Sequence, residues 1–310
     1  MKLSVLIPSY RRPVDLGRCL AAIARQRRRP DQVVVVVRDS DPESREVVEK
    51  ATLDWPELPL EVTTVRRAGI VVALNAGLDA VIGDVYCFTD DDAEPPPCWL
   101  ERIEAHYRDP DVVGVGGRDI LVRQPETIDQ TCSVVGRGSW YGRFVGNHHL
   151  SLVPAQPMAV EILKGVNMSF RASALPGFRF DEAIAVEANS GSEFDISFAA
   201  RRNGGQLIYD PAITVNHHAR PRPDQPSRED SIRFYDYSHN TTYLLLKYLP
   251  WWRRLTFLAY FFAIGQRASW GAGTLVWDLV RQGRFPPWIE IRYSLVGKLA
   301  GVRQYLRTRR

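Results

Sequence analysis

Three consecutive carboxylates, Asp90, Asp91 and Asp92, are the clearest sign of chemistry in this sequence. They follow an apolar run at residues 85–88, which is typical of a buried strand, and a proline-rich turn at residues 95–97 ends the segment. Adjacent like charges repel by about 1 kcal/mol per pair at 4 Å in water. A divalent cation would relieve that repulsion, because Mg²⁺ or Mn²⁺ takes one or two carboxylates and leaves positions for phosphate oxygens. The alternative is a solvated acidic turn, since short acidic runs are common.

The segments before the acidic cluster predict the sheet that would carry it. Strands are predicted at residues 3–10, 33–37 and 62–65, and helices at residues 15–25, 43–50 and 69–80, with Ser40 or Asp41 as the cap of the second helix. Apolar strands that alternate with helices are typical of a parallel sheet covered on both faces. Ligands bind at the carboxyl edge of such sheets, where the aspartates would lie. We therefore predict an α/β fold with a mostly parallel, open, Rossmann-like sheet flanked by helices.

The pattern loosens after residue 115, and residues 119–160 have no clear period, as in a long functional connection. Further strands are predicted at residues 112–115, 164–171, 207–209 and 213–215, the last two on either side of Pro211, and a helix at residues 193–202. A proline-rich, charged segment at residues 220–226 is the predicted domain boundary.

Composition excludes several classes of protein. The 310 residues are 45% hydrophobic and 25% charged, which is an ordinary globular composition, and the net charge of +4 is too small to indicate nucleic-acid binding. The four cysteines have no paired spacing and read as thiols in a reducing compartment. We recognise no signal peptide and no apolar run long enough to span a membrane. The sequence therefore predicts a cytoplasmic location.

Several ordered segments resemble the family 2 glycosyltransferases, which have the glycosyltransferase A fold. They are residues 4–13, Asp39, Gly69 with residues 75–77, residues 88–95, residues 165–171, residues 193–195 and residues 209–217. The resemblance covers residues 1–220 and implies a catalytic domain with a nucleotide-binding half at residues 1–115 and an acceptor half at residues 116–220. It also implies a UDP-, GDP- or dTDP-linked sugar donor, Mg²⁺ or Mn²⁺, and inversion at the anomeric carbon. The acceptor would be a saccharide or lipid-linked hydroxyl, in polysaccharide, cell-envelope or glycolipid synthesis.

The resemblance assigns the metal to Asp90 and Asp92, which match the family's DxD acids, and to His217, which follows the last strand. A metal bridging the diphosphate would stabilise the charge of the leaving group. Asp91 would ligate the metal or contact the donor. His218 is the rival for the role of His217.

The resemblance also assigns a nucleotide site. The residues that would meet the donor are Pro8, Ser9, Tyr10 and Arg12 in the first loop, Asp39 after the second strand, Arg67 (or Arg66) at the diphosphate, and Gly69. A carboxylate at position 39 accepts from an N–H or O–H of the base or ribose. The sequence around Asp39 departs from the family pattern, so that the register could shift by two residues to Asp41. The alternative is that these residues form an ordinary proline turn with solvated arginines and have no role in binding a nucleotide.

The catalytic base is Glu193 or Asp195. The family has a Glu-Asp pair at the start of this helix, and its aspartate takes the proton of the acceptor hydroxyl. Ser192 stands where the pair begins, so that Glu193 occupies the position of the base. The other interpretation is that both acids only stabilise the helix N-terminus electrostatically. Because Ser192 departs from the family pattern, the protein could also be a catalytically inactive sugar-nucleotide-binding protein at a membrane. A sugar nucleotidyltransferase is a further alternative, but it would require a glycine-rich loop after the first strand.

The C-terminal region, residues 227–310, is predicted to be helical, aromatic and basic. Tryptophans and arginines alternate over residues 232–310, as in a helix that lies in the plane of a membrane surface. Such a region would place the protein on the inner face of the cell membrane as a peripheral protein. The alternative is a helical subdomain that buries its tryptophans against the catalytic domain or a second subunit. The sequence identifies neither the sugar, the nucleobase and the acceptor nor the oligomeric state.

Overall fold

The computed structural model describes residues 1–124, 126, 128–184, 191–219, 231–266, 268–283 and 285–309. The chain forms two compact units. Unit 1 comprises Met1–Arg137, Val145–Phe180 and Ile196–Pro223, and unit 2 comprises Gly138–Phe144, Asp181–Asp195 and Asp224–Arg310. The domain boundary predicted at residues 220–226 lies outside the described residues.

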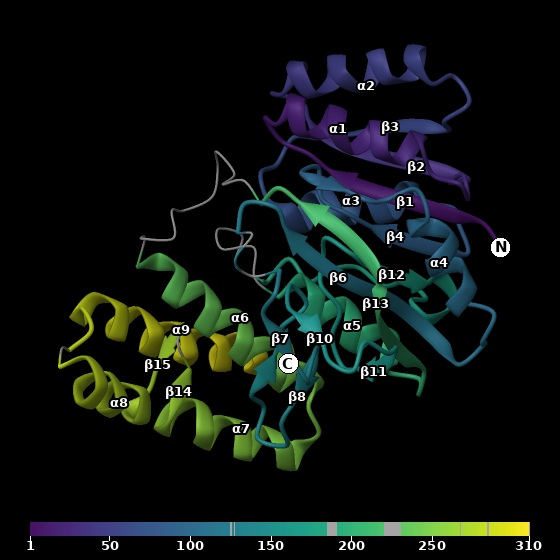
Figure 1. The fold of residues 1–310 in the computed structure, drawn as a ribbon. Helices are drawn as coiled ribbons and strands as arrows, with labels where there is room; N and C mark the ends of the chain where they lie inside the picture. The colour runs from purple at the N-terminus through teal and green to yellow at the C-terminus, as the bar shows by residue number, and fades with distance from the viewer. Residues whose placement is uncertain are drawn as a thin grey trace. The chain divides into compact units, whose positions relative to one another are not determined.

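Unit 1 is built on one mixed sheet (Figure 1). Its strands are β1 (Leu3–Pro8), β2 (Gln32–Arg38), β3 (Leu60–Val65), β4 (Val85–Phe88), β5 (Ala93–Glu94), β6 (Val112–Leu121), β11 (Met158–Val160), β12 (Met168–Arg171) and β13 (Gln206–His217). Among the described residues their order is β11-β13-β6-β12-β4-β1-β2-β3, with β5 beside β13. The pairs β1–β2, β1–β4, β2–β3 and β6–β13 are parallel, whereas β12 runs antiparallel to both of its neighbours. The prediction of a mostly parallel sheet is confirmed.

Helices cover both faces of this sheet. They are α1 (Pro13–Ala24), α2 (Pro42–Asp54), α3 (Ile70–Ala80), α4 (Trp99–His106) and α5 (Ser192–Arg201), and a short 3₁₀ turn, η2, spans Ala172–Ala174. Alternate residues of β2 belong to different cores: Val35 packs in the cluster that contains residues of α1, α2 and α4, and Val34 in the cluster that contains residues of α3. A strand buried on both faces must be apolar throughout, and this explains the uninterrupted valine run.

The later strands differ from the sequence prediction. The strand predicted at residues 112–115 extends to Leu121, and the two strands predicted around Pro211 form the single strand β13. Its register against β6 shifts between Asp210 and Thr214, so that the proline lies in an irregularity that needs no ladder hydrogen bond. A Cβ at Gly117 would lie 1.8 Å from the carbonyl oxygen of Ile213, so only glycine allows this approach.

The connection predicted at residues 119–160 contains short strands. They are β7 (Thr131–Cys132), β8 (Arg137–Gly138), β9 (Phe144–Val145) and β10 (Ser151–Leu152), in addition to β11. Two-residue strands have no measurable period, and this explains why the sequence pattern did not reveal them.

The C-terminal part of unit 2 is helical, as predicted. It contains α6 (Ile232–Tyr248), α7 (Trp251–Ala263), α8 (Ala272–Gln282), α9 (Trp288–Arg307) and a small ribbon of β14 (Gly265–Gln266) and β15 (Ser269–Trp270). Helix α9 lies close to α6, because a Cβ at Gly297 would be 2.4 Å from the carbonyl oxygen of Tyr235. Among the described residues, no helix is both long and apolar enough to cross a membrane.

Candidate active site

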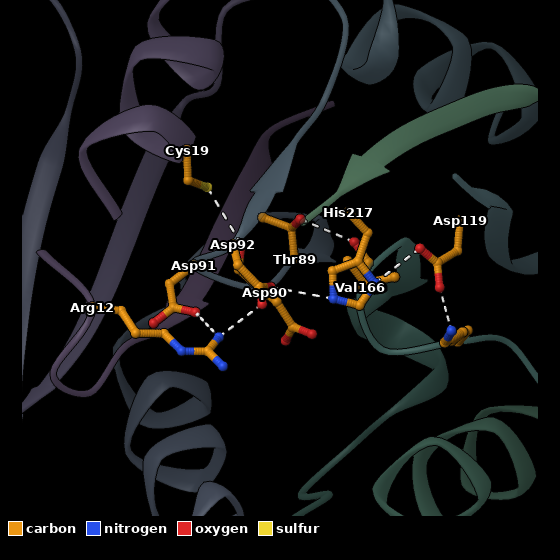
Figure 2. A network of polar contacts seen from close by, with 10 residues as sticks. Arg12, Cys19, Thr89, Asp90, Asp91, Asp92, Asp119, Val166 and His217 are labelled. Carbon is orange, nitrogen blue, oxygen red and sulfur yellow. Dashed lines mark hydrogen bonds and ion pairs between the residues drawn. The ribbon is translucent and has the colours of Figure 1, made fainter. Parts of the chain in front are cut away.

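The acidic cluster lies where β4 ends, beside the end of β13. Strand β5 follows the cluster and pairs antiparallel with β13, so that Ala93 lies opposite His217. The amide of His218 donates to the carbonyl oxygen of Asp92 at 2.9 Å. These main-chain contacts bring Asp90, Asp92 and His217 together, with one candidate ligand atom from each side chain within 4.8 Å of the other two (Figure 2).

The chemistry of these donor atoms fits a hard divalent cation. Two carboxylates and one imidazole suit Mg²⁺ or Mn²⁺ and leave room for phosphate oxygens or water. Asp92 is 3% exposed, while Asp90 and His217 are partly exposed, so the group is open on one side. His218 does not take part, because its Nε2 lies 3.3 Å from Glu94.

The first loop holds two of the aspartates from the other side. Arg12 is 7% exposed, and its Nη1 donates to Asp91 Oδ1 at 3.0 Å and to Asp92 Oδ2 at 2.8 Å. Ser9 Oγ donates to Asp91 Oδ2 at 2.9 Å. Both side chains therefore contact the acidic cluster directly, and Figure 2 shows Arg12 beside Asp91 and the two neighbouring aspartates. Hydrogen bonds to charged groups in a buried site are strong, so the loop and the cluster should form one rigid edge.

A second carboxylate orients the histidine. Asp119 is fully buried and lies 2.9 Å from Nδ1 of His217, whose Nε2 lies 3.3 Å from Asp92 Oδ1. Lys164 forms an ion pair with the other oxygen of Asp119. Burial alone would lower the pKa of His217, but hydrogen bonds to Asp119 and Asp92 outweigh it and raise the pKa to about 10. Burial would raise the pKa of Asp119, but His217 and Lys164 keep it below its usual range. The raised pKa of His217 therefore reflects the negative charge of the neighbouring carboxylates.

Sequence reasoning missed Asp119 and the role of Lys164. Asp119 lies in the stretch that has no pattern, and its contact with His217 spans 98 residues. Asn167, in the segment at residues 165–171, was noted only as part of a motif. It is buried, and its side chain bonds Trp99 and the carbonyl oxygens of Arg118 and Ile213, so that it joins α4, β6 and β13.

The residues predicted for the nucleotide lie at the same edge of the sheet. Pro8 ends β1, and the ring of Tyr10 lies under the guanidinium of Arg38, 3.7 Å from its carbon. Asp39 is exposed after β2, whereas Asp41 is buried and caps α2 by accepting from Ser44 N. The prediction of Ser40 or Asp41 as the cap is thereby resolved in favour of Asp41.

The remaining nucleotide residues precede α3. Arg67 is exposed, and Gly69 is the N-terminal cap of the helix. The φ of Gly69 is 120°, a value that residues with a Cβ rarely adopt. A substitution there would disturb the start of α3.

Both candidates for the base belong to unit 2, in the first turn of α5. Asp195 is fully buried, and its carboxylate accepts from Lys247 Nζ at 3.0 Å, Tyr248 OH at 2.6 Å and the amide of Asp181 at 2.8 Å. Glu193 is partly exposed, and Ser192 Oγ lies 3.3 Å from its Oε2. The two acids thus differ in surroundings: Asp195 is enclosed by donors and Glu193 is accessible.

Comparison with known proteins agrees with these features. Residues 4–142 match the sequence family described as Glycosyl transferase family 2. The chain is 26% identical over 234 residues to the glucosyl-dolichyl phosphate glucuronosyltransferase of Haloferax volcanii, covering 70% of this chain and 69% of the relative. Alignments with six further curated glycosyltransferases cover only 30–41% of those relatives.

Solved structures show the fold. The mannosyltransferase PcManGT from Pyrobaculum calidifontis, solved with GDP-Man and Mn²⁺, has a TM-score of 0.58 at 19% identity, covering 100% of this chain and 88% of that chain. TarS from S. aureus, solved with UDP-GlcNAc, has a TM-score of 0.57 at 17% identity, covering 84% of this chain and 73% of that chain. With its mixed sheet, its acidic strand end and these matches, the chain is similar to the family 2 glycosyltransferases over residues 4–142 and has the glycosyltransferase A fold.

Proposed function

We propose that this protein transfers a sugar from a nucleotide-diphospho-sugar to an acceptor hydroxyl, with inversion at the anomeric carbon. The observation that carries the proposal is the convergence of Asp90, Asp92 and His217 within 4.8 Å at the carboxyl edge of the sheet. These side chains would hold Mg²⁺ or Mn²⁺, which supplies positive charge to the diphosphate of the donor when bound. The Mn²⁺ and GDP-Man named with PcManGT support this assignment.

The first loop would connect the nucleotide to the metal ligands. Ser9, Arg12 and Asp91 position the acidic cluster, since they contact one another there. Beside them, Pro8 and Tyr10, the exposed Asp39, Arg67 and the Gly69 turn bind the nucleoside diphosphate. A carboxylate at Asp39 selects an N–H or O–H of the base or ribose.

Glu193 would act as the general base. It takes the proton of the acceptor hydroxyl while the acceptor oxygen bonds the anomeric carbon and the bond from that carbon to the diphosphate breaks. One in-line displacement of this kind inverts the anomeric centre and releases the nucleoside diphosphate. The three donors around Asp195 favour Glu193 for this role, because they occupy the carboxylate oxygens of Asp195.

The acceptor would be a saccharide or a lipid-linked hydroxyl, in polysaccharide, cell-envelope or glycolipid synthesis. The name of the Haloferax relative, which acts on glucosyl-dolichyl phosphate, supports a lipid-linked substrate. Residues 232–310 would then contact the inner face of the cell membrane peripherally, with the catalytic unit in the cytoplasm.

The test is a thermal-shift screen of UDP-, GDP- and dTDP-sugars, each with and without Mn²⁺. A donor at 100 times its Kd stabilises the folded protein by about 2.7 kcal/mol. We expect one nucleotide class to raise Tm, and only with the metal. The donor identified is then incubated with candidate acceptors, and proton NMR of the product reports inversion. Donor binding without turnover on any acceptor would instead identify a catalytically inactive sugar-nucleotide-binding protein.

A further inference from the structure

We propose that one face of α9 is a docking surface for a bilayer that contains anionic lipids. This face, called the α9 outer face, consists of exposed residues along the whole helix. They are Trp288, Arg292, Leu295, Val296, Leu299, Arg303 and Leu306. The inference rests on the membrane contact proposed above and assigns it to a particular surface and lipid class.

The spacing of these residues places them on one side of the helix. From Trp288 the steps are 4, 7, 8, 11, 15 and 18 residues, which follow the helical repeat of 3.6. Trp288 is 74% exposed, Leu299 54% and Leu306 57%. A helix that spans Trp288–Arg307 is about 30 Å long at 1.5 Å per residue, so the apolar stripe runs about that far.

The opposite side of α9 packs against other parts of unit 2. Ser294, Gly297, Lys298 and Gly301 are buried, and the two glycines approach the backbone of α6. Lys298 Nζ donates to the carbonyl oxygens of Phe261 and Trp270. In this helix small and polar residues face inward, and large apolar side chains face outward. This inverts the usual pattern of a surface helix and marks a surface that binds something.

Charge favours a lipid surface as the partner. Residues 231–310 contain 13 arginines and lysines but only three acidic residues, whereas residues 1–230 contain 27 and 33. The excess positive charge of the chain is therefore confined to this region. Arginines within an apolar stripe suit an anionic bilayer, because their stems lie among the lipids while the guanidinium groups reach the phosphates.

A second copy of the chain fits the same surface less well. In a twofold contact, Arg292 and Arg303 of one chain would meet the same arginines of the other. Among the described residues, α9 has one acidic side chain, Glu290, and it accepts from Trp270 Nε1 at 3.1 Å. Burying unmatched arginines is costly, so the composition opposes a dimer through this face.

Helix α8 has a similar character. Val276, Trp277 and Val280 are 61%, 59% and 78% exposed, and Arg281 lies over the ring of Trp277 at 4.6 Å. Tryptophans beside arginines are common where helices lie at a membrane surface. Helix α8 therefore presents a second group of exposed apolar side chains in unit 2.

The experiment measures flotation of the full-length protein with vesicles of phosphatidylcholine alone or with about a third phosphatidylglycerol. We expect binding only to the anionic vesicles, and weaker binding at 0.5 M salt, where charges are screened. Leu295→Gln with Leu299→Gln should lower the partition coefficient about tenfold or more, since glutamine preserves helix propensity while removing apolar area. Arg292→Gln with Arg303→Gln should lower it about 30-fold, at about fivefold for each arginine near the surface.

Matched controls lie in unit 1. Leu53→Gln with Ile82→Gln changes side chains that are 82% and 72% exposed, and Arg108→Gln with Arg202→Gln removes two exposed arginines. Both controls should float like the wild type. The proposal is overturned if the wild type ignores anionic vesicles, if the controls lose as much binding as the α9 variants, or if light scattering shows a dimer that the leucine variant dissociates. Because the thermal shift with donor is read on the same proteins, loss of vesicle binding with donor binding intact separates this proposal from the proposed function.

Discussion

In unit 1, Asp92 contacts the ring of His217 and Asp90 lies close to both, whereas in unit 2 Asp181 and Asp195 accept from hydrogen-bond donors. The first group brings atoms that accept or ligate within 4.8 Å of one another. In the second, Lys247 Nζ donates to both aspartates, at 2.9 Å and 3.0 Å, while Tyr248 also donates to Asp195. Both groups are acidic and largely buried, but only the first gathers the ligand atoms that suit a divalent cation, and the second is built around a lysine.

The difference distinguishes a binding site from a structural network of hydrogen bonds and ion pairs. This network, called the clamp, consists of Asp181, Asp195, Lys247 and Tyr248. Carboxylates that face each other repel, and a chain retains such an arrangement when a cation offsets the repulsion. Carboxylates that face lysine and tyrosine are stabilised by the protein itself. Removing one of these donors should therefore destabilise the folded protein. Four variants test this distinction, beginning with the largest expected effect, and a fifth tests a buried lysine elsewhere in unit 2.

Glu193→Gln should lower turnover by about 10²–10⁴-fold, since the amide cannot take the acceptor proton, while donor affinity stays unchanged. The measurement is steady-state transfer with the donor found by thermal shift. The matched variant is Asp195→Asn, which removes a charge two residues away and should lower Tm. If Asp195→Asn remains folded and loses turnover while Glu193→Gln keeps it, Asp195 is the base and the clamp is catalytic.

Asp92→Ala should weaken metal-dependent donor binding by more than about 100-fold, because the change removes a ligand rather than one of its supports. Isothermal titration with donor, with and without Mn²⁺, measures the effect. Asp79→Ala is the control, since the Asp79 side chain is 59% exposed in a surface ion pair with Arg179. Equal affinity of the Asp92 variant and the wild type in Mn²⁺ would exclude the metal role.

Lys247→Met should destabilise the protein by about 3 kcal/mol, because it leaves the buried Asp195 without its cation. Urea unfolding followed by circular dichroism gives the free energy of unfolding. Lys50→Met removes an exposed pair with Asp54, and we expect about 0.5 kcal/mol or less from it. Similar values for the two variants would contradict the clamp.

Asp119→Asn should weaken Mn²⁺ binding about 10–100-fold, since the carboxylate orients the His217 ring and fixes the proton on Nδ1. Electron paramagnetic resonance of free Mn²⁺ reads the affinity without donor or turnover. The exposed Asp111→Asn serves as the control. A loss of Tm with unchanged Mn²⁺ affinity would make Asp119 a purely structural residue.

The smallest expected effect concerns Lys298. Its buried ammonium donates to main-chain carbonyl oxygens, which carry no charge. Burial lowers its pKa to about 8 from the ordinary value of 10.5. Between these values the unfolded chain holds a proton that the folded chain has released, so the free energy of unfolding should rise with pH in this window and stay flat below it. Lys298→Met should remove the rise. An identical pH dependence of the two proteins would refute the shifted pKa.

Local patterns predicted the part of the fold that depends on neighbouring residues. The apolar run of β4 and the acids after it could be identified from short windows of sequence, and the cap of α2 could be narrowed to Ser40 or Asp41, of which the structure shows Asp41. These features depend on strand periodicity, charge and capping, which act over a few residues.

Features that depend on distant pairing were not predictable. Nothing near Pro211 shows that two apolar runs form the single strand β13, because the irregularity is defined against β6. Asp119 gains its role only when β6 and β13 lie parallel, with Leu121 opposite His217. A single sequence contains no signal for such contacts, and therefore the partner of the histidine was missed.

The position of His217 in the sheet also bears on how the chain assembles. In the strand order, β6 and β12 separate β13 from β4, which leads to Asp90 and Asp92. Contacts between residues far apart in the chain form slowly, since a long loop must close before they are made. The cation site should therefore be among the last features to appear during refolding. Recovery of Mn²⁺ affinity would then report completion of the whole sheet, and it would lag behind the return of helical signal.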